Sequence, residues 1–317
     1  MKELDRFDWA AIEQVLAREG QALLPCVLSG ADCDALTVLD TGDKAFGDVG
    51  TLDDLLLGGT ELRQLKLPSL VDLRKNLFEK LVPIANRWNA TMGIRTRYPA
   101  RLDELLRQCR EAWQVTPQSV VLRLRAGEQL PLKQNAEGDH VFPLQVSVLL
   151  KQPGSDFTGG EMIMTEQRPR MQTRPMVVPL QRGDATVFAV HHRPFQGSKG
   201  SYRVNLRHAV SRVRSGERIA LDLVFHNAPK KTWTLLGADR KPYQSDVPGS
   251  LGGHRGTRIY GQLTCRAANR AISRGGYVKD RVFFVDEATA KAACFRPCAV
   301  CMPLAYEAWK AARLRSA

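Results

Sequence analysis

A chain of 317 residues, 44% of them hydrophobic, is long enough for one large folded domain with a smaller second one. The formal net charge of +13 and a pI of about 9.6 predict a polyanionic partner, with nucleic acid first and an anionic membrane surface second. No apolar run approaches the roughly 20 residues that span a bilayer, and the N-terminus lacks a signal-peptide pattern, so we expect a cytoplasmic protein without a membrane partner.

The first part of the chain, residues 1–118, is predicted to be a helical and mixed layer that supports the rest. Residues 5–40 indicate two helices around a short strand, with Ser29 as the N-cap of the second helix. Apolar residues at helical spacing continue over 52–93, and an amphipathic helix follows at 101–113.

Residues 119–228 favour a β structure. Short apolar strands are expected at 120–125, 142–150, 162–164, 177–180, 185–190, 202–213 and 219–225, with Gly or Pro at the junctions. Short strands with regular turns and no helices between them are typical of a sandwich or jelly roll. The predicted fold class is α+β, with a helical N-terminal layer on a jelly-roll core.

The last part of the chain is predicted to be a linker at 229–256 and a compact unit at 257–317. The linker is inferred from Gly, Pro, Lys and Ser, and the compact unit from helical patterns at 286–293 and from 304 onward. Residues 252–317 carry twelve Lys or Arg against four Asp or Glu, a net charge of about +8. We therefore expect DNA or another nucleic acid to bind this basic C-terminal region.

Several long motifs lie in the predicted β region: GDHVFPLQ at 138–145, DFTGGE at 156–161, EQRPR at 166–170 and YRVNLRH at 202–208. With them, residues 5–228 resemble a bacterial branch of the Fe(II)- and 2-oxoglutarate-dependent oxygenases associated with oxidative repair of damaged DNA. The resemblance implies a double-stranded β-helix, another name for this jelly roll. Such enzymes hold Fe(II) with two histidines and one carboxylate and leave positions open for the 2-oxo acid and O2.

The resemblance implies roles for four residues. His208 matches the distal iron ligand, and Arg218, ten residues later, matches the residue whose planar guanidinium pairs with a carboxylate of 2-oxoglutarate. The proximal His-x-Asp pair falls on Lys133 and Asn135. An ammonium group has no lone pair and an amide offers only a neutral carbonyl oxygen, so two of three iron ligands are substituted.

The sequence offers two alternatives to this assignment. A competing register would use His192 and Arg203, eleven residues apart. Asp139 and His140 could in principle replace the lost ligands, but adjacent residues on a strand point to opposite faces, so reaching one metal would need a bulge or loop.

A cysteine-containing segment at 257–303 resembles the metal-binding domain of the Ada DNA-alkylation repair protein, through IYGQLTC at 259–265 and RPCAVC at 296–301. The resemblance implies a zinc site of four thiolates. Cys265, Cys298 and Cys301 match three of them, and Gly261 occupies the position of the fourth. In the resembled domain the cysteine at that fourth position accepts a methyl group from DNA. Glycine has no thiol, so methyl transfer at this position is not expected. Cys294, His254 or Asp280 could supply the fourth ligand.

Two functional hypotheses follow. The first is an oxygenase-type protein of the DNA alkylation-damage repair or nucleic-acid modification class with a recast metal site. The second is a catalytically inactive oxygenase-fold protein that contains zinc and binds DNA, with His208 and Arg218 as remnants or anion ligands. Iron binding and succinate formation from 2-oxoglutarate distinguish them.

Overall fold

The computed structural model of the chain describes residues 4–37, 49–51, 68–197 and 200–315. The chain divides into two compact units, Met1–Lys230 and Lys231–Ala317. Among the described residues, no helix has the length and apolar character needed to cross a bilayer. The helical pattern expected over 52–67 lies outside the described residues.

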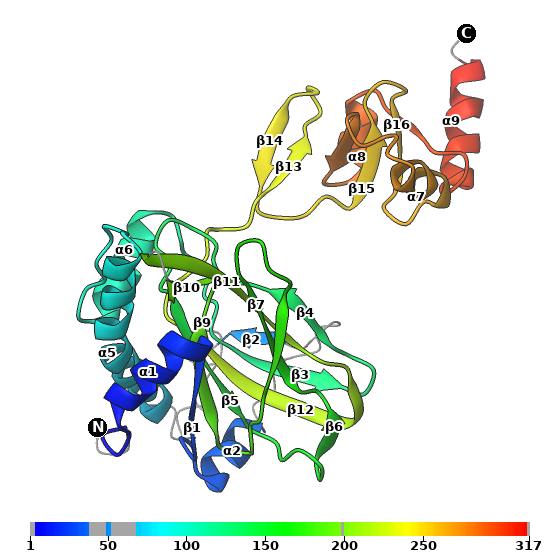
Figure 1. Cartoon of the computed structure of the whole chain (residues 1–317). Helices are drawn as coiled ribbons and strands as arrows, with labels where there is room; N and C mark the ends of the chain where they lie inside the picture. Colours follow the sequence, from blue (N-terminus) through cyan, green and yellow to red (C-terminus); the bar gives the residue numbers. More distant parts are fainter. Residues whose placement is uncertain (1–3, 38–48, 52–67, 198–199, 316–317) are drawn as a thin grey trace. The chain divides into compact units, whose positions relative to one another are not determined.

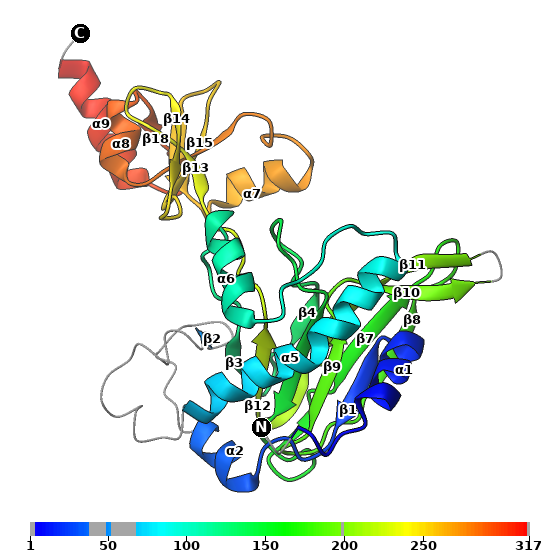
Figure 2. The same cartoon turned by 90° about the vertical axis from the view of Figure 1, so that its left-hand side faces the viewer.

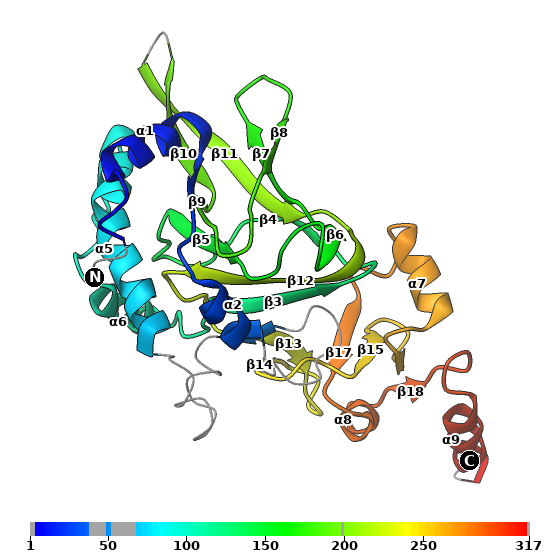
Figure 3. The same ribbon diagram turned by 90° about the horizontal axis from the view of Figure 1, so that it is seen from below.

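The first unit is built on two antiparallel sheets, which Figure 3 shows as separate layers. The larger sheet has the order β1-β9-β5-β12-β3-β2, with β6 also paired to β12, and the smaller has the order β10-β11-β7-β8, with β4 also paired to β11. The larger sheet contains β1 (Gln21–Leu24), β2 (Val49–Thr51), β3 (Val120–Arg125), β5 (Leu144–Leu149), β6 (Phe157–Gly159), β9 (Ala185–Ala189) and β12 (Val213–Val224). The smaller contains β4 (Leu130–Lys133), β7 (Met162–Gln167), β8 (Arg174–Val178), β10 (His192–Gly197) and β11 (Gly200–Val210).

The chain passes repeatedly between these sheets from β3 to β12, which is the arrangement of a jelly roll. The structure thus confirms a mixed helical and curled antiparallel fold. Strands β4 and β10 were not predicted, and both contain a proline, Pro131 and Pro194, which argues against a strand in sequence alone. All residues of β5 and β9 are buried because these strands lie in the middle of the larger sheet.

The described helices of this unit are α1 (Trp9–Glu19), α2 (Gly30–Thr37), α5 (Pro68–Thr91) and α6 (Leu102–Glu111), and Figures 1 and 2 show α1 and α5 beside the sheets. Asp8 starts α1 by accepting hydrogen bonds from two backbone N–H groups of the first turn. The expected cap at Ser29 is present, since its hydroxyl accepts from the Asp32 N–H at 3.2 Å. Phe78 of α5 packs against Phe142 and Phe225, with ring centroids 4.9 and 5.8 Å away.

The second unit begins with a hairpin of β13 (Trp233–Leu236) and β14 (Pro242–Ser245). A four-stranded sheet follows in the order β17-β15-β16-β18, made of β15 (Leu251–His254), β16 (Ile259–Gln262), β17 (Arg281–Phe284) and β18 (Arg296–Pro297). Its helices are α7 (Arg266–Ser273), α8 (Glu287–Ala292) and α9 (Pro303–Arg315).

The linker expected at 229–256 is corrected by this arrangement. Leu236 of the hairpin belongs to the small core of the second unit with Tyr260 and Phe284, and β15 is an inner strand of the sheet. Residues 229–256 contain few large apolar residues because a small sheet buries few side chains. Their composition therefore resembles that of a linker. Helix α7 was also missed, because none of its residues is buried.

Candidate functional site

His208 lies inside the first unit, on β11. The β11–β4 ladder places it opposite Lys133, and only 3% of the histidine surface is exposed. The Phe188 ring packs against it at 5.1 Å in an edge-on arrangement. Burial, followed by the charge of Lys133, lowers the pKa of His208 to about 4, with Asp222 acting in the opposite direction. The imidazole is therefore neutral at neutral pH.

A chain of amide groups connects Asn135, two residues after Lys133, to the His208 ring. The Asn135 amide nitrogen donates to the Gln145 side-chain oxygen at 2.8 Å, and the Gln145 nitrogen lies 3.5 Å from His208 Nε2. Gln145 is buried on β5, where its exposed fraction is 1%. His208 Nδ1 is buried and has no hydrogen-bond partner among the described residues.

Arg218 occupies β12, opposite Leu124 of β3, and is 2% exposed. Its Nε and Nη1 atoms are buried and have no hydrogen-bond partner in the described part of the chain. Burial lowers the pKa of Arg218 to about 10, and the nearby Asp222 opposes that shift. Gly160 allows this packing, since a Cβ on its backbone, which has a φ of +66°, would lie 3.0 Å from Arg218 Cδ.

Asp222 was not singled out from the sequence, yet it influences both His208 and Arg218. It lies on the same face of β12 as Arg218, four residues on, and accepts a hydrogen bond from Ser147 at 2.6 Å. Asp222 lies between Leu221 and Leu223, so the sequence gives no sign that its side chain belongs to a site rather than to a core strand. Ser147 and Gln145 were missed because they too lie between apolar residues of a strand.

The competing assignments find less support. Arg203 is exposed and donates to the Met92 carbonyl oxygen, whereas Arg218 is buried. Asp139 and Glu137 are exposed in a segment outside any strand, and the backbone N–H of His140 donates to Gln114 at 2.7 Å. Of the two registers, only His208 with Arg218 places both residues in the interior.

The buried His226 and the half-buried His191 form a second pair of histidines in the first unit. Burial lowers the pKa of His226 and of His191 to about 4 each. His226 Nδ1 accepts from the Phe142 N–H at 3.2 Å, while its Nε2 has no partner among the described residues. The described His, Cys, Asp and Glu side chains form no metal-type group here.

The second unit gathers three of its cysteines. The sulfurs of Cys265, Cys298 and Cys301 all lie within 4.8 Å of one another. Cys265 directly precedes α7, and the backbone N–H of Cys298 donates to the Tyr260 carbonyl oxygen at 2.8 Å, which holds the cysteine loop to β16. Burial acts to raise the pKa of Cys298, but the backbone N–H groups of Cys301 and Val300, together with the side chains of Cys301 and Cys265, lower it overall.

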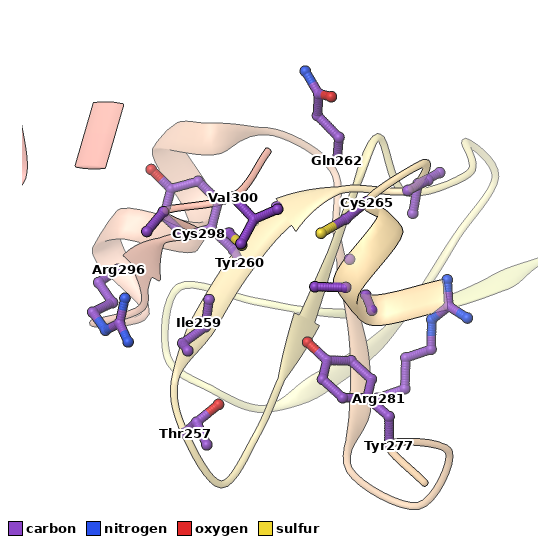
Figure 4. Close-up of a pocket in the computed structure, with 16 residues that line it drawn as sticks. Thr257, Ile259, Tyr260, Gln262, Cys265, Tyr277, Arg281, Arg296, Cys298 and Val300 are labelled. Atoms are coloured by element: carbon purple, nitrogen blue, oxygen red, sulfur yellow. The ribbon is translucent and has the colours of Figure 1, made fainter. Parts of the chain in front are cut away.

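Gly261 of β16 lies against the Cys301 side chain and beside Cys298. A Cβ at this position would be 2.6 Å from Cys301 Sγ and 3.1 Å from Cys298 Cβ. A cavity of about 350 Å³ opens beside Gly261, and Figure 4 shows Cys265 and Cys298 on its wall together with Tyr277 and Arg281.

The candidates for a fourth ligand lie outside the three-sulfur group. His254 Nε2 lies 3.8 Å from an Asp280 oxygen, and His254 Nδ1 accepts from the Thr257 N–H at 3.1 Å. Cys294 is exposed and lines a different cavity of about 490 Å³. That cavity also presents basic and aromatic side chains, namely Arg258, Lys291, Arg296, Arg313, Phe295 and Trp309.

Comparisons with known proteins agree with the sequence motifs of the first unit. Residues 61–228 match a family described as an oxygenase catalysing oxidative methylation of damaged DNA. Uncharacterized proteins from two strains of Mycobacterium tuberculosis are 40% identical over 156 residues, covering 49% of this chain and 67% of each relative.

Solved structures with a similar fold include an oxidoreductase of the 2OG-Fe(II) oxygenase family from Burkholderia pseudomallei, with a TM-score of 0.39 and 15% identity over 71% of this chain and 93% of that one. A Pseudomonas putida prolyl-4-hydroxylase has a TM-score of 0.38 and 12% identity, over 69% and 98% of the two chains. Because the family match spans more than half of the sequence, the chain belongs to this family of oxygenases.

Proposed function

We propose that this chain is a nucleic-acid-binding member of its oxygenase family, in the class that acts on damaged DNA, whose jelly roll does not hold catalytic Fe(II) and whose second unit holds zinc. The observation that carries the proposal is the pairing of His208 with Lys133 across β4 and β11. A cationic side chain lies where the family resemblance expects the first iron ligand.

The side chains around His208 do not fit Fe(II). An oxygenase iron site needs two imidazoles and a carboxylate on one face of the metal. Lys133 offers an ammonium group without a lone pair, and the Asn135 amide nitrogen is engaged with Gln145. The Gln145 amide in turn lies next to His208 Nε2. Of the three ligands that the resemblance expects, only the His208 imidazole is present.

The Arg218 guanidinium supports a remaining role in binding carboxylates. A buried guanidinium with two unpartnered nitrogens is costly unless an anion pairs with it, and its planar geometry suits a carboxylate. Lys133 adds a second positive charge near His208. We therefore expect 2-oxoglutarate, or another small carboxylic acid, to bind at Arg218 without iron.

Three thiolates in the second unit fit zinc, which prefers sulfur ligands in small domains of this kind. Cys265, Cys298 and Cys301 would hold it, and the ion would join the start of α7 to the loop after β18. A bound zinc would supply the structural connection that a core of only seven buried residues provides weakly.

Nucleic-acid binding is supported by the larger cavity of the second unit. The Arg296 guanidinium lies over the Tyr306 and Trp309 rings at 5.5 and 5.8 Å, and Arg258 and Lys291 also line the cavity. Cations suit phosphates, and an aromatic ring beside them suits a base. This surface lies in the region whose sequence is most basic.

The central test measures iron binding and succinate formation. The purified protein is titrated with Fe(II), and 2-oxoglutarate decarboxylation is assayed with and without alkylated DNA. We expect one zinc, no iron and no succinate. Succinate formation that depends on Fe(II) would overturn the proposal and restore the catalytic hypothesis.

A double variant, Lys133→His with Asn135→Asp, tests the position of the site. It should gain Fe(II) binding, because it returns an imidazole and a carboxylate opposite His208. Lys241→His with Asn269→Asp makes the same changes at exposed positions of the second unit and should gain none. Equal iron binding by both variants would contradict the assignment.

DNA binding is measured by fluorescence anisotropy with a labelled oligonucleotide at several salt concentrations. Because phosphate contacts release counterions, log affinity should fall linearly with log salt. Arg258→Ala should weaken binding, whereas Arg97→Ala, an exposed arginine of the first unit, should not. Salt-independent binding would contradict this role for the basic surface.

A further inference from the structure

The three-sulfur group of the second unit is one ligand short of a closed zinc site. Structural zinc is bound by four protein ligands, whereas three protein ligands and an exchangeable fourth position are typical of zinc that binds an external molecule. Cys265, Cys298 and Cys301 form the only such group among the described residues.

The cavity of the second unit reaches the sulfur group, since Cys265, Cys298 and Gly261 all line it. Both the sulfur group and the cavity of about 350 Å³ border this glycine. His254 and Asp280 lie against each other, and Cys294 borders the other cavity, so none of the three fills the position in this conformation. A molecule in the cavity can therefore reach a metal held by the three cysteines.

We propose that zinc in this unit takes its fourth ligand from the cavity, and that this ligand is the thiolate of a small anionic thiol. The inference rests on the zinc site of the proposed function. The thiol releases its S–H proton to solvent as its sulfur binds, and no electrons are exchanged.

Charge favours an anion in the cavity. Zinc with three thiolates carries a net charge of −1, while Arg281 and Arg296 both line the cavity. The Arg281 guanidinium lies over the Phe283 ring at 4.9 Å, which holds it at the cavity edge. These two cations can offset both the metal site and a carboxylate on the ligand.

Size and lining indicate a small ligand with a short apolar part. A cavity of about 350 Å³ is at the lower end of the range for small-molecule sites, which is roughly 300–1,000 Å³. Ile259, Ala268 and Val300 provide apolar surface. A thiol is preferred over a harder oxygen donor because sulfur ligands match the soft metal site that the cysteines create.

The test uses the full chain with Co(II) in place of zinc and follows the sulfur-to-cobalt absorption. Addition of 3-mercaptopropionate should raise this absorption by about one third, as the thiolate count goes from three to four. In Gly261→Cys the Cys301 sulfur must move away from the new Cβ, which would otherwise lie 2.6 Å from it. The new thiolate then supplies the fourth ligand from the chain, so the absorption should begin near the higher level and should not respond.

Arg281→Met provides a second variant that leaves the sulfur group intact. It should weaken binding of 3-mercaptopropionate about tenfold and leave binding of the uncharged 2-mercaptoethanol unchanged. Failure to bind Co(II) at all would contradict the zinc site itself. Co(II) binding with no response to either thiol would instead overturn the exchangeable position.

Discussion

Two buried histidines, His208 and His226, and the half-buried His191 should make the first unit sensitive to mild acid. Burial lowers the pKa values of His191, His208 and His226 from 6.5 to about 4. Because the folded pKa lies below the unfolded one, the unfolded chain binds protons first as pH falls. The stabilisation is complete above about pH 6.5 and is lost progressively as the pH falls toward 4.

The size of the effect follows from these pKa values. Between pH 7 and pH 5 each histidine should lower the free energy of unfolding by about 2 kcal/mol, and the three together by about 5 to 6 kcal/mol. A typical domain is stable by roughly 5–15 kcal/mol in total, so a loss of this size is readily measured.

Urea denaturation at pH 7, 6 and 5 provides the measurement. Replacing Trp233 and Trp309 with Phe restricts the tryptophan fluorescence to the first unit. We expect the unfolding midpoint to fall steadily, and His208→Gln to reduce the pH-dependent loss by about one third. His254→Gln, in the second unit, should not reduce it. An unchanged midpoint from pH 7 to 5 would refute the assignment of neutral buried imidazoles.

Three further predictions concern Arg218, Glu166 and the cysteines. Arg218→Met should abolish 2-oxoglutarate binding measured by calorimetry in the presence of EDTA; binding that persists would place the acid elsewhere. Glu166 is 1% exposed and forms hydrogen bonds with Arg168 and with the fully buried Arg193. Glu166→Gln should therefore lower the urea-unfolding free energy of the first unit by about 3–5 kcal/mol, because it leaves Arg193 buried without a counter-charge. Chelation of zinc should lower the melting temperature of the second unit, and Cys298→Ser should remove that dependence; a chelator-insensitive unit would contradict a bound metal.

The sequence predicted those features that depend on apolar periodicity or on the residues of a family motif. Periodic apolar residues predicted most of the described helices but fewer than half of the described strands. The family resemblance identified His208 and Arg218, and the fold buries each of them. The resemblance to the Ada metal-binding domain grouped Cys265, Cys298 and Cys301, and their sulfurs do lie together. Their roles as ligands remain predictions.

The residues around these sites were harder to predict because their contacts cross the sheets. Gln145 and Ser147 alternate with apolar residues in a strand that is entirely buried, so nothing local distinguishes them from core positions. Their partners, Asn135 and Asp222, lie 10 and 75 residues away. Only the pairing of β5 with β12 brings Ser147 and Asp222 together.

The position of β15 has a practical consequence for work on the second unit. This strand pairs with β16 on one side and β17 on the other, and Leu236 of the preceding hairpin joins the same core. A protein fragment that starts at residue 257 would lose an inner strand and expose the unpaired backbone of its two neighbours. A fragment that starts at Lys231 keeps the hairpin, the whole sheet and the cysteine loop together, and is the one to express for metal and DNA measurements.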